Sequence, residues 1–183
     1  MSLTARLQNA RRQLGFSLIE ALTCTAVMSV VAGVAVPSLQ ELRAQRQLDA
    51  LSAQIETDLQ YARSEAVRSQ RTIRFAVGHD VNGSCYVIHS GPAGRCRCVP
   101  GQAPVCETGA TSLRSITIEP DSRIQLRASS SSIGFDAQRG TVTPTATLRL
   151  TAADGRAVHQ IINLVGRIRS CSPQGRMPGH KAC

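Results

Sequence analysis

The sequence predicts an α+β fold in which one long N-terminal helix packs on an antiparallel β-sheet. Three observations predict this fold. Residues 16–36 form an apolar run, residues 48–66 carry apolar side chains at steps of three and four, and short alternating segments fill the remainder. The first two patterns are typical of helices and the third is typical of strands. No internal repeat and no second domain is recognisable, so we expect a single globular domain after the helix.

The apolar run is long enough to cross a membrane. At about 1.5 Å per helical residue it matches a hydrocarbon core of roughly 30 Å. Arg6, Arg11 and Arg12 precede it, as in a basic leader, but the plausible cleavage site lies before the run and not after it, as in a conventional signal peptide. A single-pass anchor with its basic side inward is the alternative. Glu20 stands inside the run, where a carboxylate costs up to about 3 kcal/mol and therefore normally has a partner and a task.

An amphipathic helix is expected over residues 37–70, continuing the apolar helix and ending near Ser69. Pro37 stands just after the apolar run. Four arginines cluster around the helix end, where cations are favoured by the helix dipole, so we interpret them as a solvated, dipole-compensating face. They are Arg63, Arg68, Arg71 and Arg74.

Short antiparallel strands are expected in the globular part. They are predicted at residues 72–77, 85–89, 113–119, 124–127, 133–135, 147–151 and 158–164. Asp154-Gly155 is a strong hairpin signal between the last two. Residues 91–109 are rich in Gly, Pro and Cys, which predicts an irregular surface loop pinned by disulfides.

The seven cysteines divide into two groups. Cys24 lies in the apolar run, where we expect it to behave as a small buried hydrophobe. The other six are disulfide candidates, with at least one bridge expected within residues 85–106 and a clasp between the last two of them. They are Cys85, Cys96, Cys98, Cys106, Cys171 and Cys183. A metal site is the alternative for Cys96, Cys98 and Cys106 together with His89, although the spacing lacks a C-x-x-C pair.

Composition favours a binding role over catalysis. The formal net charge is +9, and +6 remains without the three arginines of residues 1–15, which suits polyanions or acidic surfaces as partners. The sequence has no serine elbow, no phosphate-binding glycine loop and no metal-binding histidine pair. We therefore expect a non-enzyme without a cofactor or metal.

The C-terminal segment carries concentrated positive charge. From Arg156 onward there are five cationic side chains and no acid. In an extended backbone Arg167 and Arg169 lie on one side, roughly 7 Å apart, which is close to the spacing of phosphates along a DNA strand. Gly166 lets the backbone turn before them, and the Pro and Gly residues after them suggest a loop that adapts to a duplex. A solvated basic tail is the alternative interpretation.

The junction Gly15-Phe16 with Glu20 resembles the class III leader of type IV pilins and pseudopilins. The resemblance implies that a prepilin peptidase cuts between Gly15 and Phe16 and methylates the new amino group of Phe16. It also implies that Glu20 meets the N-terminal amine of a neighbouring subunit during filament assembly, which gives a buried charge a partner. Pro37 occupies the place where these proteins commonly carry a helix-kinking proline.

The whole pattern, ending in G-R-x-R, is similar to the GspH/FimT family and its FimT branch of minor type IV pilins. The resemblance implies a type IV pilin-like fold and binding of extracellular double-stranded DNA during uptake for natural transformation. The motif maps onto Gly166, Arg167 and Arg169. The assisting cations would be Arg156, Arg176 and Lys181.

Partners implied by the resemblance are double-stranded DNA, major and other minor pilins, the prepilin peptidase and, before assembly, the inner membrane. Two alternatives are a GspH-like pseudopilin of type II secretion and a minor pilin that primes pilus assembly. The implied organisation is a cleaved leader at 1–15, a membrane or filament-core helix at 16–36, an amphipathic half at 37–70, a β-rich domain at 71–170 and a basic tail at 171–183.

Overall fold

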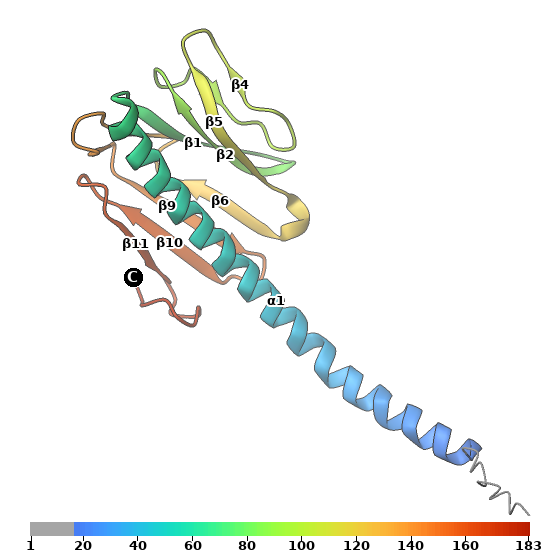
Figure 1. The fold of residues 1–183 in the computed structure, drawn as a ribbon. Helices are drawn as coiled ribbons and strands as arrows, with labels where there is room; N and C mark the ends of the chain where they lie inside the picture. The colour runs from blue at the N-terminus through green and yellow to red at the C-terminus, as the bar shows by residue number, and fades with distance from the viewer. Residues whose placement is uncertain (1–16) are drawn as a thin grey trace, which may run out of the picture. The chain divides into compact units, whose positions relative to one another are not determined.

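The computed structural model describes residues 17–183, which form parts of two compact units. The first unit ends at Glu41 and the second begins at Leu42. Helix α1 (Leu18–Ser69) contributes to both units and ends at the predicted residue (Figure 1).

The first unit, as far as it is described, is the apolar part of α1. Its described side chains are exposed, among them Leu18, Val27 and Val34. Within residues 17–183, α1 is the one helix long and apolar enough to cross a membrane by length and composition. Cys24 is exposed on this part of α1, which differs from the expected burial.

The larger sheet of the second unit has five antiparallel strands in the order β5-β2-β1-β7-β8. Its strands are β1 (Ile73–Asp80), β2 (Gly83–Ser90), β5 (Thr111–Ile118), β7 (Ser132–Phe135) and β8 (Val142–Thr143). The expected loop at residues 91–109 contains a short ribbon of β3 (Cys96–Arg97) and β4 (Val105–Cys106).

The smaller sheet has four antiparallel strands in the order β11-β10-β9-β6. Its strands are β6 (Ile124–Ala128), β9 (Ala146–Ala152), β10 (Ala157–Ile162) and β11 (Ile168–Cys171). The short helix η1 (Pro120–Ser122) precedes β6. The predicted turn at Asp154-Gly155 joins β9 to β10, which confirms the hairpin. Because β11 pairs only with β10, it forms an edge of this sheet.

The hydrophobic core lies between the second half of α1 and the two sheets (Figure 1). The helix contributes the residues that its three-and-four pattern predicted, with Leu51 partly buried beside them. They are Leu48, Ile55, Leu59, Ala62 and Ala66, all fully buried. Among residues 17–36 and 38–183, every buried side chain lies at or after Leu48. A fragment covering residues 38–183 keeps this core, so we expect it to fold without the apolar part of α1.

Polar side chains fix α1 against both sheets. Asp58 is 1% exposed, and its carboxylate accepts a hydrogen bond of 2.6 Å from the Tyr86 hydroxyl and pairs with Arg114 at 2.7 Å. On the smaller sheet, the buried Gln160 amide donates to the Ser52 carbonyl at 2.6 Å and to its hydroxyl at 3.1 Å. Burial and the hydrogen bond to Asp58 raise the pKa of Tyr86 above its usual range.

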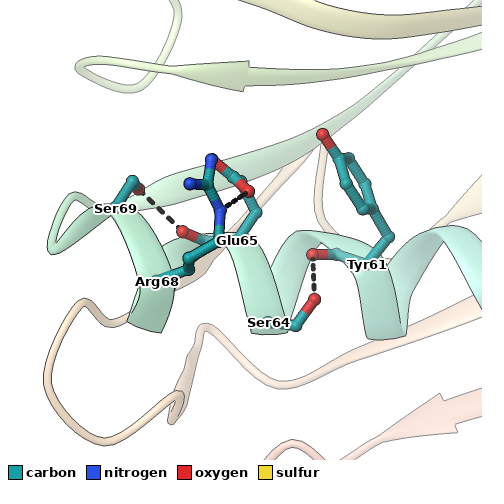
Figure 2. Close-up of polar contacts among 5 residues, drawn as sticks. All are labelled: Tyr61, Ser64, Glu65, Arg68 and Ser69. Atoms are coloured by element: carbon teal, nitrogen blue, oxygen red, sulfur yellow. Dashed lines mark hydrogen bonds and ion pairs between the residues drawn. The ribbon is translucent and has the colours of Figure 1, made fainter.

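Side chains of α1 itself form hydrogen bonds and an ion pair at its C-terminal end. Figure 2 shows Arg68 donating to both carboxylate oxygens of Glu65, at 2.7 and 2.8 Å, and the Ser69 hydroxyl donating to the Glu65 carbonyl. The hydrogen bonds from Arg68 hold the pKa of Glu65 below its ordinary value. Arg68 therefore lies in the last turn as a dipole-compensating, paired cation, as the sequence suggested.

Three disulfides join the six candidate cysteines. They are Cys85–Cys98, Cys96–Cys106 and Cys171–Cys183. The expected bridge within residues 85–106 and the expected C-terminal clasp are both confirmed. The alternative of a metal site at the cysteine-rich loop is wrong in this structure, because all three of its thiolate ligands are consumed by these bridges.

Candidate nucleic-acid interface

A tight turn over residues 163–167 places the basic motif. It joins β10 to β11, and Asn163 organises it. The Asn163 backbone N–H donates to the Arg167 carbonyl at 3.2 Å, its carbonyl accepts from the Gly166 N–H at 3.0 Å, and its side-chain oxygen accepts from the Arg167 N–H at 2.8 Å. Sequence reasoning missed this role of Asn163, although Asn side chains commonly hydrogen-bond to the backbone of turns.

Gly166 is required by the geometry of this turn. Its φ of 75° lies in the left-handed region, which side chains other than glycine adopt only with strain. A Cβ built on it would lie 3.0 Å from the Gly140 carbonyl oxygen and 3.1 Å from Nε of Arg63. The glycine therefore allows the turn, as the sequence predicted, and also lets the motif approach the chain around it.

Arg167 and Arg169 are both exposed and alternate with Ile168, which packs against the core. Arg169 pairs in register with Ile161, whose side chain is also exposed. Because strand side chains alternate between faces, the two arginines project away from the core, with Cα atoms about 7 Å apart. Among residues 17–183 neither guanidinium group is paired with a carboxylate.

Arg63 joins the motif from α1. It lines a surface groove of 570 Å³ together with Val67, Gly166 and Arg167. Arg63 belonged to the sequence cluster interpreted as a dipole-compensating face, and only the fold brings it beside the turn. The groove is therefore lined by one cation from the helix, Arg63, and one from the turn before β11, Arg167.

Arg156 lies apart from the motif, at the opposite end of β10. Its guanidinium pairs with Asp154 at 2.6 Å, and its side chain is 12% exposed. The same contact lowers the pKa of Asp154, first through the side-chain hydrogen bond from Arg156. The arrangement makes Arg156 part of the β9–β10 turn.

Arg176 and Lys181 are exposed on the C-terminal tail, residues 172–183. The tail is anchored, which differs from the expected adaptable loop. Met177 is 1% exposed within the core, and the Lys181 carbonyl accepts from the Ser172 N–H at 2.8 Å. His180 lies 3.1 Å from Asp49 of α1. The tail is held in place because Met177, near its middle, packs in the core, and because the Cys171–Cys183 disulfide joins its two ends.

Acidic side chains lie on the helix side of β11. The hydroxyl of Ser170, between Arg169 and Cys171, donates to Glu56 of α1 at 3.2 Å. Asp49 and Glu56 line a second groove with His180. The acids therefore face the inner side of the edge strand, while Arg167 and Arg169 face outward.

The processing residues Gly15 and Phe16 lie outside the described residues. Glu20 is exposed in the first turn of α1, and its carbonyl accepts from the Thr23 hydroxyl at 2.9 Å.

Comparisons with known proteins place the chain in a family. The family model of the type II transport protein GspH matches residues 51–166, so the match ends one residue before Arg167. A search of curated protein sequences finds no match.

Several solved structures are similar to this chain. The type IV minor pilin FimU of Pseudomonas aeruginosa is 23% identical over 70% of this chain and 94% of that chain, with a TM-score of 0.51. A second crystal form of FimU gives 23% identity over 69% and 98% of the two chains, with a TM-score of 0.50. The minor pseudopilin EpsH of the Vibrio cholerae type 2 secretion system is 16% identical over 69% and 98%, with a TM-score of 0.44. This chain belongs to the GspH family and has the type IV pilin-like fold, with one long N-terminal helix packed on antiparallel sheet.

Proposed function

We propose that this chain is a minor type IV pilin that binds extracellular double-stranded DNA through Arg167 and Arg169 during uptake for natural transformation. The observation that carries the proposal is the pair of exposed arginines on one side of an edge strand, directly after a glycine turn. Guanidinium groups grip phosphate oxygens bidentately, and such contacts are independent of base sequence. The role is one of binding and not of catalysis.

Arg63 supports the proposal, because it adds a third cation at the same turn. Arg176 and Lys181 add positive charge on the neighbouring tail. Arg156 contributes least, since Asp154 neutralises it locally. We further propose that a prepilin peptidase removes residues 1–15 and methylates Phe16, and that the apolar helix holds the chain in the inner membrane before it joins other pilins in the filament.

DNA binding by the fragment 38–183 tests the proposal. We expect binding that weakens steeply between about 50 and 200 mM salt, because phosphate contacts release counterions. The Arg167→Ala, Arg169→Ala variant should bind several-fold more weakly and unfold at an unchanged temperature, since exposed arginines contribute little to stability. Fluorescence anisotropy with duplex DNA measures the affinity.

The matched control is Arg95→Ala, Arg97→Ala. These exposed arginines have the same two-residue spacing and lie at β3, in another sheet, so the variant loses the same net charge. Equal affinities for the two double variants would contradict the assignment of the site to β11.

A second candidate is a pseudopilin of type II secretion. The family model favours it, because that model is described as a type II transport protein and its match stops before Arg167. In that role the outward face of the sheet would meet neighbouring pseudopilins or exported proteins. Absence of salt-sensitive DNA binding at low salt would shift the assignment to this candidate.

A further inference from the structure

The outward face of the four-stranded sheet is basic beyond the motif. Its inward positions are buried in the core, and its outward positions alternate with them along each strand. No Asp or Glu occupies an outward position on these four strands. The outward residues are Gln125 and Arg127 on β6, Thr147, Arg149 and Thr151 on β9, Ala157, His159 and Ile161 on β10, and Arg169 and Cys171 on β11.

The strand register aligns three of these side chains in one row across the sheet. Arg127 is opposite Arg149, and Arg149 is opposite His159. Partial burial, and then the charge of Arg149, lower the pKa of His159, so the guanidinium and the imidazole face the same space. Arg169 lies in the next row along β11, opposite Ile161. Sequence reasoning missed this row because its members come from different strands.

The spacing of the row suits a DNA groove. Neighbouring strands lie about 4.8 Å apart, which puts Arg149 of β9 roughly 10 Å across the sheet from Arg169 of β11. The major groove of a B-form duplex is about 12 Å wide between its phosphate strands. Long arginine side chains readily cover the difference.

We propose that the DNA site is bipartite, with Arg167 and Arg169 at the sheet edge contacting one phosphate strand and Arg149, assisted by Arg127, contacting the other strand across the groove. The inference rests on the proposed function, since it assigns the same ligand to a wider surface. We assign duplex DNA to this face by charge complementarity, because its charged outward side chains are all cations and because they lie in two separated groups.

Arg127 and Arg149 differ from other arginines because their charges are available to a ligand. Within residues 17–183 neither Arg127 nor Arg149 forms an ion pair with a carboxylate, whereas Arg68, Arg95 and Arg114 each have one. Arg127 also lines a groove of 390 Å³ that contains Asp80, whose carboxylate accepts from the Asn82 N–H at 2.7 Å. Arg149 is therefore the principal cation of the second group.

The test compares duplex with single-stranded DNA. The fragment 38–183 and its Arg127→Ala, Arg149→Ala variant are titrated against a duplex of about 20 base pairs, two helical turns, and against one of its strands alone. We expect the variant to bind the duplex several-fold more weakly and to lower the slope of log affinity against log salt by about 2. For the single strand, it should behave like Arg95→Ala, Arg97→Ala. Arg127→Lys, Arg149→Lys should restore most of the duplex affinity, and thermal unfolding checks that each variant is folded.

The outcomes separate the two proposals. Loss of duplex affinity in the Arg167, Arg169 variant alone overturns the bipartite site and leaves the proposed function intact. If neither the Arg127, Arg149 variant nor the Arg167, Arg169 variant loses duplex affinity, both proposals are contradicted. Equal losses on duplex and single strand, relative to the control, overturn the bridging of two strands. Poly-glutamate is titrated in parallel as an acidic polymer. Loss of its binding in the Arg127→Ala, Arg149→Ala variant, with unchanged duplex affinity, assigns the face to an acidic protein and also overturns the inference.

Discussion

The neighbours of each arginine decide whether its charge is available to a ligand. Arg68 and Arg156 are each held by a carboxylate within three residues in sequence. Arg167 and Arg169 stand on an edge strand whose nearby acids lie on the inner side. Because a paired guanidinium must be released before it grips a phosphate, two arginines with similar sequence surroundings differ in what they can bind.

Tyr86 predicts how stability responds to alkaline conditions. Its raised pKa means that the folded state keeps the phenol proton when the unfolded state, with an ordinary pKa near 10, releases it. The unfolding free energy should therefore be independent of this group at neutral pH and fall as the pH rises above about 10, by up to about 1.4 kcal/mol per pH unit. Urea unfolding of the fragment 38–183 at several alkaline pH values measures the slope.

Replacement of Tyr86 by Phe isolates this contribution. The variant should be less stable at neutral pH by about 1–3 kcal/mol, because Asp58 loses a buried hydrogen-bond donor, and its alkaline slope should be shallower. Tyr61→Phe is the control, since Tyr61 is the other tyrosine and is exposed. A slope in Tyr86→Phe equal to that of the parent would contradict the argument.

At the scale of elements, the sequence predicted those whose side chains alternate or repeat over several residues. The end of α1 at Ser69 is as expected, and each of the seven predicted segments became a strand. The last of them stops at Ile162 and not at residue 164, because Asn163 begins the turn. β3, β4 and β8 have two residues each and are too short to carry a periodic signal.

The C-terminal tail is an element whose anchor was missed. Met177 lies among Pro and Gly residues, so no periodicity marks it, yet it is buried in the core. Replacing Met177 by Ala should lower the unfolding free energy by about 2–5 kcal/mol through the cavity it leaves. It should also speed amide hydrogen exchange at Ser172 and Cys183, whose N–H groups donate within the tail.

Arg176→Ala provides the comparison for this prediction. Arg176 precedes Met177 and is exposed, so its removal should change stability by less than about 0.5 kcal/mol. If both variants had the same stability and exchange rates, the tail would not depend on its apolar anchor.

For the whole molecule, the positions of sites depend on register and on contacts between distant segments. The spacing of Arg167 and Arg169 is local, and it was predictable. The row from Arg127 to His159 and the approach of Arg63 to Gly166 were not, because they are fixed by strand pairing and by helix packing that a single sequence does not display.

Assembly and DNA binding should be separable, because Glu20 and Arg167 belong to different units. We expect Glu20→Ala in the full chain to reduce incorporation into filaments, since the carboxylate is proposed to pair with a neighbouring subunit. Thr23→Ala, one turn away on the same exposed helix, should not. Quantifying the chain in sheared filaments from cells measures incorporation. Wild-type levels of Glu20→Ala would contradict the role proposed for the carboxylate.

The two disulfides of the cysteine-rich loop interleave in sequence, because Cys96 lies between Cys85 and Cys98, and Cys98 lies between Cys96 and Cys106. Cys96 and Cys98 are only two residues apart in sequence, so each can readily form the disulfide that belongs to the other. Oxidation can therefore give a mispaired product. Reduced protein that is oxidised by air after purification should yield a mixture of disulfide isomers, whereas oxidation in the presence of a thiol–disulfide isomerase should converge on one product. Maturation of this protein is thereby tied to the quality-control enzymes of the compartment in which it oxidises.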